Sequence, residues 1–139
     1  MKAKPRIPPG QRQVQDFPIL HIGSIPVFEP GTWDFRVEGL VENPIHLTWE
    51  EFQKLPKSLT ISDFHCVTGW TRLDNQWDGV LFRDIAHLCR PKPEARAVTI
   101  LCDGGYYTSL PLSILMDDNV ILAYIWNGHY LEPAHGQPL

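Results

Sequence analysis

The sequence predicts an α+β fold with a mixed or mainly antiparallel β-sheet and short helices packed on it. Thirteen prolines and ten glycines divide the 139 residues into short segments, which favours short strands and loops over a helical bundle. Strand-like and helix-like patterns also alternate along the chain, which is typical of this fold class. A 43% hydrophobic composition is sufficient for one core. We therefore expect residues 1–139 to form a single domain.

The first element is an extended N-terminal arm over residues 1–30. Six prolines between positions 5 and 30 prevent a continuous helix, so this arm must lie along another part of the protein. A strand is predicted over residues 32–40, where Trp33, Phe35 and Val37 alternate with polar side chains.

A short helix is predicted to follow that strand. Thr48 and Glu51 have the spacing of a capping box, and Pro56 ends the helical pattern. The segment 58–67 then returns to strand-forming residues. A second helix is predicted within residues 79–91, with one apolar face formed by Leu81, Ile85, Leu88 and Cys89.

The last third of the chain is predicted to consist of strands. Residues 95–105 and 106–112 are consistent with two strands joined by a glycine turn. Residues 119–133 form the clearest hairpin pattern, because the Asn127-Gly128 pair suits a type I′ turn.

The composition excludes several classes of protein. Net charge is −4, and the twelve lysines and arginines are dispersed, so we expect no nucleic-acid partner. No segment has the apolar length of a secretory signal or of a membrane span. We expect a cytoplasmic protein without a membrane-spanning segment.

Cys66 is the residue whose chemistry is most informative. It ends a strand-like run, with His65 before it and a segment predicted as loop, containing Thr68 and Arg72, after it. One interpretation is a reactive or metal-binding thiolate, and the other is a small buried hydrophobe. The remaining cysteines have no C-x-x-C spacing and are predicted to pack in the core; they are Cys89 and Cys102.

Two further positions are candidates for a binding site. His135 lies in the turn-rich segment "EPAHGQPL", where the backbone is expected to approach another group closely. Asp103 precedes two glycines, which indicate a tight turn but no phosphate-binding loop. No nucleophile elbow is present, so a serine hydrolase is not supported.

Taken together, the segments resemble the molybdopterin-binding domain of the sulfite oxidase family from about Phe17 to Leu139. The segments that carry the resemblance occur in the family's order: "DFRVEGLVENPIHLTWEEFQKLP", "DFHCVTGW", "WDGVLFRDI", "YYTSLPL" and "VILAYIWNGHYLEPAHGQPL". The pieces "RIPPGQ" and "FPILHIGSIP" are most similar to the small bacterial cytoplasmic members.

The resemblance implies a molybdenum–molybdopterin cofactor. Cys66 would ligate molybdenum through its thiolate, beside the two dithiolene sulfurs of the pyranopterin, and soft sulfur donors suit such a metal. Tyr106 corresponds to the family's active-site tyrosine, although packing on the sheet is an equally good interpretation of its pattern. The expected cofactor-binding residues are His65, Thr68, Arg72, Asp103 and His135.

The implied activity is oxygen-atom transfer on a small oxyanion or S-oxide, with a redox partner protein. The stretch "CVTGWTR" has Arg72 but no second arginine, which argues against sulfite as the substrate. The family continues past its "HGxPLR" motif, whereas this sequence ends at Leu139. We therefore expect a shortened C-terminal edge that self-associates or weakens cofactor binding.

Two alternatives remain open. One is a shortened, non-catalytic interaction module of the same fold that does not retain the cofactor. The other is a thiol redox enzyme that uses Cys66 without a metal, with Cys102 approaching it in space.

Overall fold

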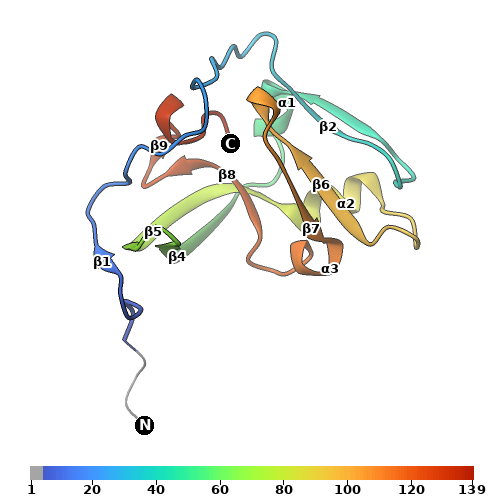
Figure 1. Ribbon diagram of the computed structural model, residues 1–139. Coiled ribbons are helices and arrows are strands. Elements are labelled where there is room, and N and C mark those ends of the chain that lie inside the picture. Colours follow the sequence, from blue (N-terminus) through green and yellow to red (C-terminus); the bar gives the residue numbers. More distant parts are fainter. Residues whose placement is uncertain (1–4) are drawn as a thin grey trace.

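A computed structural model describes residues 5–139 and confirms the α+β class (Figure 1). The largest sheet has five strands. They are β1 (Arg12–Gln13), β4 (Ser58–Cys66), β5 (Trp70–Leu81), β8 (Ile121–Trp126) and β9 (His129–Tyr130). The β8–β9 hairpin confirms the predicted turn, since Asn127 and Gly128 have φ values of 47° and 83°.

Strand β5 organises this sheet. β4 pairs with it antiparallel along one edge. The other edge is shared, because β1 pairs with it in parallel at Trp70 and Thr71 and β8 pairs antiparallel from Trp77 to Leu81. The arm and the C-terminal hairpin are thus held by opposite ends of one strand.

The prediction of a loop after Cys66 was wrong beyond Gly69, where β5 begins. Polar residues interrupt its apolar alternation, and the most unusual of them is Asn75, which is fully buried. Its side chain donates to the carbonyls of Ser62 and Arg72, at 3.1 and 2.8 Å. Its oxygen accepts from Arg72 and Trp126. Because every polar atom of the amide has a partner, Asn75 is stable inside the protein.

Two small antiparallel sheets complete the architecture. β2 (Asp34–Val37) pairs with β3 (Ile45–Thr48), and β6 (Ala97–Leu101) pairs with β7 (Tyr107–Pro111). The predicted strand at residues 32–40 and the predicted pair over residues 95–112 are confirmed. β3 was not predicted. The connection between β6 and β7 is the 3₁₀ turn η1 (Asp103–Gly105).

The helices are short. α1 (Trp49–Gln53) has the predicted capping box, with the Glu51 carboxylate accepting from the Thr48 amide at 2.8 Å. α2 (Phe82–Cys89) begins later than predicted. Two further helical segments were not predicted: α3 (Leu112–Leu115) and η2 (Pro133–His135).

The predicted apolar face of α2 is only partly correct. Ile85 and Cys89 are buried, but Leu81 is the last residue of β5 and Leu88 is 43% exposed. Leu88 therefore lies outside the core because the helix starts after Leu81 and its buried face follows Ile85, Ala86 and Cys89.

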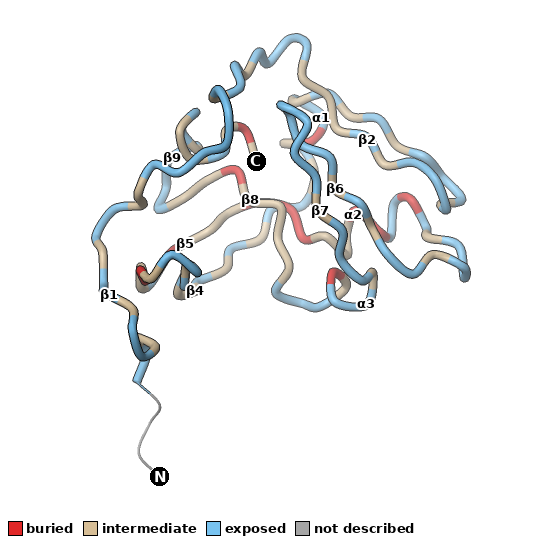
Figure 2. The backbone as a smooth tube through the Cα atoms, viewed as in Figure 1, coloured by how far each residue is buried: buried red, intermediate tan, exposed pale blue. Residues whose placement is uncertain are grey.

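The core lies between the main sheet, α1 and α2. It is formed by Phe52, Val80, Ile85 and Tyr124. Figure 2 shows that buried residues are few and scattered along the chain. The accessible surface is 9742 Å², whereas a compact monomer of 15.9 kDa exposes about 7,400 Å². Several large apolar side chains contribute to this surface, among them Ile22, Val27 and Leu101.

Within the predicted arm, the structure describes residues 5–30, and Arg12–Gln13 pairs with β5 of the main sheet. Phe17 anchors the arm, with ring centroids 5.0 to 5.9 Å from those of four aromatic side chains: Phe64, Trp70, Trp77 and Trp126. Residues 1–4 of the predicted arm lie outside the described residues.

Candidate functional site

Cys66 ends β4 and opens a tight turn. Its side chain is half-buried, so the thiol is not enclosed in the core. Its Sγ lies 3.1 Å from the Thr68 hydroxyl, which lowers the pKa of the Cys66 thiol, assisted by the Thr68 backbone amide. The Cys66 carbonyl accepts from the Gly69 amide and from Gln11 Nε2, both at 3.0 Å. The turn thus presents an accessible thiol whose pKa is lowered by its neighbours.

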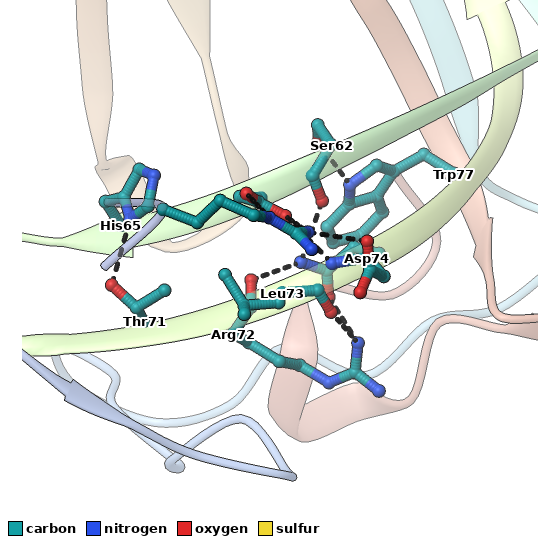
Figure 3. A network of polar contacts seen from close by, with 10 residues as sticks. Ser62, His65, Thr71, Arg72, Leu73, Asp74 and Trp77 are labelled. Carbon is teal, nitrogen blue, oxygen red and sulfur yellow. Dashed lines mark hydrogen bonds and ion pairs between the residues drawn. The ribbon is translucent and has the colours of Figure 1, made fainter. Parts of the chain in front are cut away.

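His65 belongs to a different set of contacts. Its Nδ1 lies 2.9 Å from the hydroxyl of Thr71, on the neighbouring strand (Figure 3). Successive side chains of a strand point to opposite faces, so the His65 ring and Cys66 Sγ leave β4 on opposite sides. The structure does not bring His65 to the thiol.

Arg72 is held within the fold. Its Nε donates to the Gln15 carbonyl and its Nη1 to Asn75, both at 2.8 Å. The guanidinium also lies 4.5 Å from the Trp126 ring centroid, a cation–π geometry. Arg72 therefore joins the arm to β5 and β8, and Nε and Nη1 are already engaged.

A second polar cluster fixes the start of the arm next to Arg72. Arg6 donates to the carboxylates of Asp63 and Asp74, both at 2.6 Å at the closest approach. The hydrogen bond from Arg6 lowers the pKa of Asp63 to about 2. Figure 3 shows Asp74 of this cluster and Arg72, both on β5.

Asp103 and Tyr106 share a hollow of about 280 Å³. The hollow is also lined by arm residues 21, 22 and 24–26, by Gly104 and Gly105, and by Pro133 and Ala134. Tyr106 is 59% exposed, so its phenol is accessible rather than packed on the sheet. The structure thus joins three segments that are distant in the sequence.

His135 lies beside this hollow, next to Ala134. Its Nε2 is 3.2 Å from the Phe17 carbonyl and its Nδ1 is 4.0 Å from Glu132. The expected close approach of backbone at His135 is therefore present, and the approaching segment is the arm.

The candidate residues form two groups. Asp103 and Tyr106 line the hollow, with His135 beside it, whereas Cys66 and Thr68 do not line it. Sequence reasoning missed the hollow's arm residues, including His21 and Ser24. No local pattern marks them, because only the course of the arm brings them to η1.

The other two cysteines differ from each other. Cys89 is buried in α2, as predicted, and its burial raises the pKa of its thiol. Cys102 is exposed, so its predicted core position was wrong. It directly follows Leu101, the last residue of β6, which is itself 79% exposed. No other element of the described structure therefore covers this end of the strand.

The possible metal-ligating side chains are dispersed over the described structure. Among residues 5–139, no three His, Cys, Asp or Glu side chains gather closely enough to hold a metal ion. A metal at Cys66 would therefore lack a full set of protein ligands, and a cofactor that brings its own donors suits such a site. No helix within the described chain is long and apolar enough to cross a membrane.

The fold and the accessible thiol define an α+β domain that can offer one sulfur to a metal-bearing cofactor. A family profile described as oxidoreductase molybdopterin binding domain matches residues 22–139. The chain belongs to this family. The predicted family and its sulfite-oxidase-like fold are confirmed.

Three curated relatives illustrate the family. The chain is 43% identical to the uncharacterized oxidoreductase YuiH of Bacillus subtilis, over 96% of this chain and 68% of that protein. It is 28% identical to the NADH nitrate reductase of Ulva prolifera, over 84% of this chain and 17% of that protein. It is also 28% identical to the putative protein-methionine-sulfoxide reductase subunit YedZ1 of Azospira oryzae, over 86% of this chain and 46% of that protein. The chain spans less than half of the last two proteins.

A solved structure confirms the fold independently. The chain is similar to the sulfane dehydrogenase SoxCD from Paracoccus pantotrophus, with a TM-score of 0.74. The match covers 85% of this chain and 35% of that chain, at 23% sequence identity.

The molybdenum cofactor that the family implies fits the residues present. The half-buried Cys66 thiol is a soft donor, and its pKa is lowered by Thr68. The described residues contain no group of three His, Cys, Asp or Glu side chains that would hold a metal by themselves. A pyranopterin would supply the remaining sulfur donors.

Proposed function

We propose that this protein is a molybdenum-cofactor-dependent oxidoreductase that transfers an oxygen atom to or from a small oxyanion or S-oxide. Membership of the family supports the cofactor class, and relatives named as nitrate and methionine-sulfoxide reductases support the substrate class. The observation that carries the proposal is the accessible Cys66 thiol with its lowered pKa.

Cys66 and Thr68 act at the metal. Cys66 would hold the metal through Sγ, and the Thr68 hydroxyl stabilises the thiolate by donating to it. The cofactor, when bound, supplies two-electron chemistry at molybdenum. The protein positions that group and tunes its electrostatics.

The hollow serves the substrate and the organic part of the cofactor. Tyr106 presents an exposed phenol there, able to donate a hydrogen bond to an oxygen of the substrate. Asp103 can accept hydrogen bonds at the same rim. The cofactor-binding roles of His65, Arg72 and His135 stay predictions, as does the cytoplasmic location.

The decisive experiment compares two cysteine variants. Wild type, Cys66→Ser and Cys102→Ser are produced in cells that synthesise the cofactor, and molybdenum is measured per chain. Cys102→Ser is the matched control because Cys102 is also a free thiol, and it is more exposed. We expect full molybdenum occupancy in wild type and Cys102→Ser, and a markedly lower occupancy in Cys66→Ser. Equal molybdenum in Cys66→Ser contradicts the proposal.

The non-catalytic module is the second candidate. It is favoured by the separation of Cys66 from the hollow, since Cys66 does not line it. The visible absorption spectrum separates the two functions, because molybdenum bound by sulfur donors absorbs visible light and an empty domain does not. A thiol redox role would instead produce a bond between Cys66 and Cys102, detectable by alkylation and mass spectrometry.

Exposed apolar surface is the feature that supports binding to partner proteins. Two groups of side chains are more than half exposed: Leu59 and Ile61 on β4, and Leu101 and Tyr107 on β6 and β7. Such surface supports both the self-association and the redox partner that we propose. Gel filtration with light scattering tests the first, and a monomer over the whole concentration range contradicts it.

A further inference from the structure

One side chain of the arm connects Cys66 to His65. Gln11 directly precedes β1, and its Nε2 lies 3.0 Å from the Cys66 carbonyl. Its Oε1 contacts the hydroxyl of Thr71. The same hydroxyl lies 2.9 Å from His65 Nδ1 (Figure 3). The four groups form a continuous chain of hydrogen bonds.

The chemistry of the groups fixes the direction of every bond. A carbonyl only accepts, so the amide nitrogen of Gln11 must face Cys66 and its oxygen must face Thr71. Thr71 has one hydroxyl proton, and Gln11 Oε1 requires it. The Thr71 oxygen is then an acceptor for His65. His65 must therefore carry a hydrogen on Nδ1.

Burial makes this arrangement hard to replace. Thr71 has no exposed surface, so water does not substitute for its partners. The arm also has backbone bonds that do not involve the Gln11 side chain, since the Arg12 amide donates to Gly69 O at 3.0 Å and the Val14 amide to Thr71 O at 2.8 Å. A change of the Gln11 side chain therefore leaves the arm in place.

We propose that Gln11 is a positioning residue for the Cys66 turn and that its amide also fixes His65 in the Nδ1–H tautomer. Gln11 and the Gly69 amide share the two lone pairs of the Cys66 carbonyl, which sets the backbone from which Sγ projects. The importance of this turn for metal binding rests on the proposed function. The hydrogen-bond chain itself does not.

Two variants of Gln11 separate the two halves of the proposal. Gln11→Glu retains an acceptor for Thr71 but cannot donate to Cys66, whereas Gln11→Met loses both bonds. Gln13→Met is the control, because Gln13 is an exposed glutamine of β1, two positions after Gln11. Nuclear magnetic resonance reports the His65 tautomer through its ring nitrogen shifts, at a pH where the ring is neutral. It also reports hydrogen exchange of the Gly69 amide.

We expect wild type and Gln13→Met to show the Nδ1–H tautomer and slow Gly69 exchange. Gln11→Glu keeps the tautomer and exchanges Gly69 about tenfold faster, as expected for loss of one hydrogen bond. Gln11→Met changes both readouts, because Thr71 then turns its proton toward Nδ1.

An Nε2–H tautomer in wild type overturns the proposal, even if a variant fails to fold. An unchanged tautomer in Gln11→Met, or unchanged Gly69 exchange in both variants, also overturns it. Molybdenum content, measured on the same wild-type protein, shows whether the proposed function fails independently of the hydrogen-bond chain. A wild-type protein with the Nδ1–H tautomer and no molybdenum contradicts the proposed function alone.

Discussion

Replacing Phe17 by alanine tests whether one aromatic side chain holds the arm on the sheet. A fully buried Phe→Ala change costs about 3–5 kcal/mol. Phe17 is only partly buried, but four aromatic centroids lie 5.0 to 5.9 Å from its own, and aromatic pairs add about 0.5–1.5 kcal/mol each. We expect the free energy of unfolding to fall by about 2.5 kcal/mol, measured by guanidinium chloride denaturation.

Phe28→Ala is the matched control. Phe28 is a partly buried phenylalanine of the same arm, but it has one aromatic neighbour, Trp49, at 5.3 Å. Its replacement should cost about 1 kcal/mol. If Phe17→Ala costs no more than Phe28→Ala, the ring cluster does not anchor the arm and the reasoning is refuted.

Three further predictions concern packing, pH and the thiol. Gly79→Ala should prevent folding into soluble protein, because an added Cβ would lie 2.1 Å from a β8 carbonyl oxygen; soluble expression at the wild-type level would contradict this. Asp63 has a pKa lowered to about 2 by its hydrogen bond with Arg6, so the stability it contributes is present above pH 4 and is lost as pH falls toward 2. Acid unfolding of Asp63→Asn should lack this dependence, and an identical acid profile would exclude the ion pair. Thr68→Val should raise the pKa of Cys66 and slow its alkylation at pH 7.5 several-fold, measured by peptide mass spectrometry; an unchanged rate would show that the hydroxyl does not stabilise the thiolate.

Local signals in the sequence predicted several elements correctly. The helix at Thr48 and the hairpin at Asn127 depend on capping and turn residues that act over a few positions. β5 could not be predicted in this way. Asn75 is tolerated in its interior because Ser62 and Trp126, distant in the sequence, complete the hydrogen bonds of its amide that Arg72 alone leaves open.

The same distinction between local signals and long-range contacts applies to the candidate site. The strand-ending position of Cys66 follows from its neighbours, and the structure leaves its thiol accessible. The hollow around Tyr106 depends on the course of the arm, which brings His21 to η1. No short pattern encodes that approach, since it joins segments that are about 80 and 110 residues apart in the sequence.

X-ray absorption spectroscopy at the molybdenum edge tests most directly whether Cys66 is a ligand of the metal. Wild type and Cys66→Ser, both loaded with the cofactor, are compared for the number of sulfur atoms bound to molybdenum. The account predicts three sulfurs in wild type and two in the variant, because only the cysteine donor is removed. The same sulfur count in both proteins would contradict it.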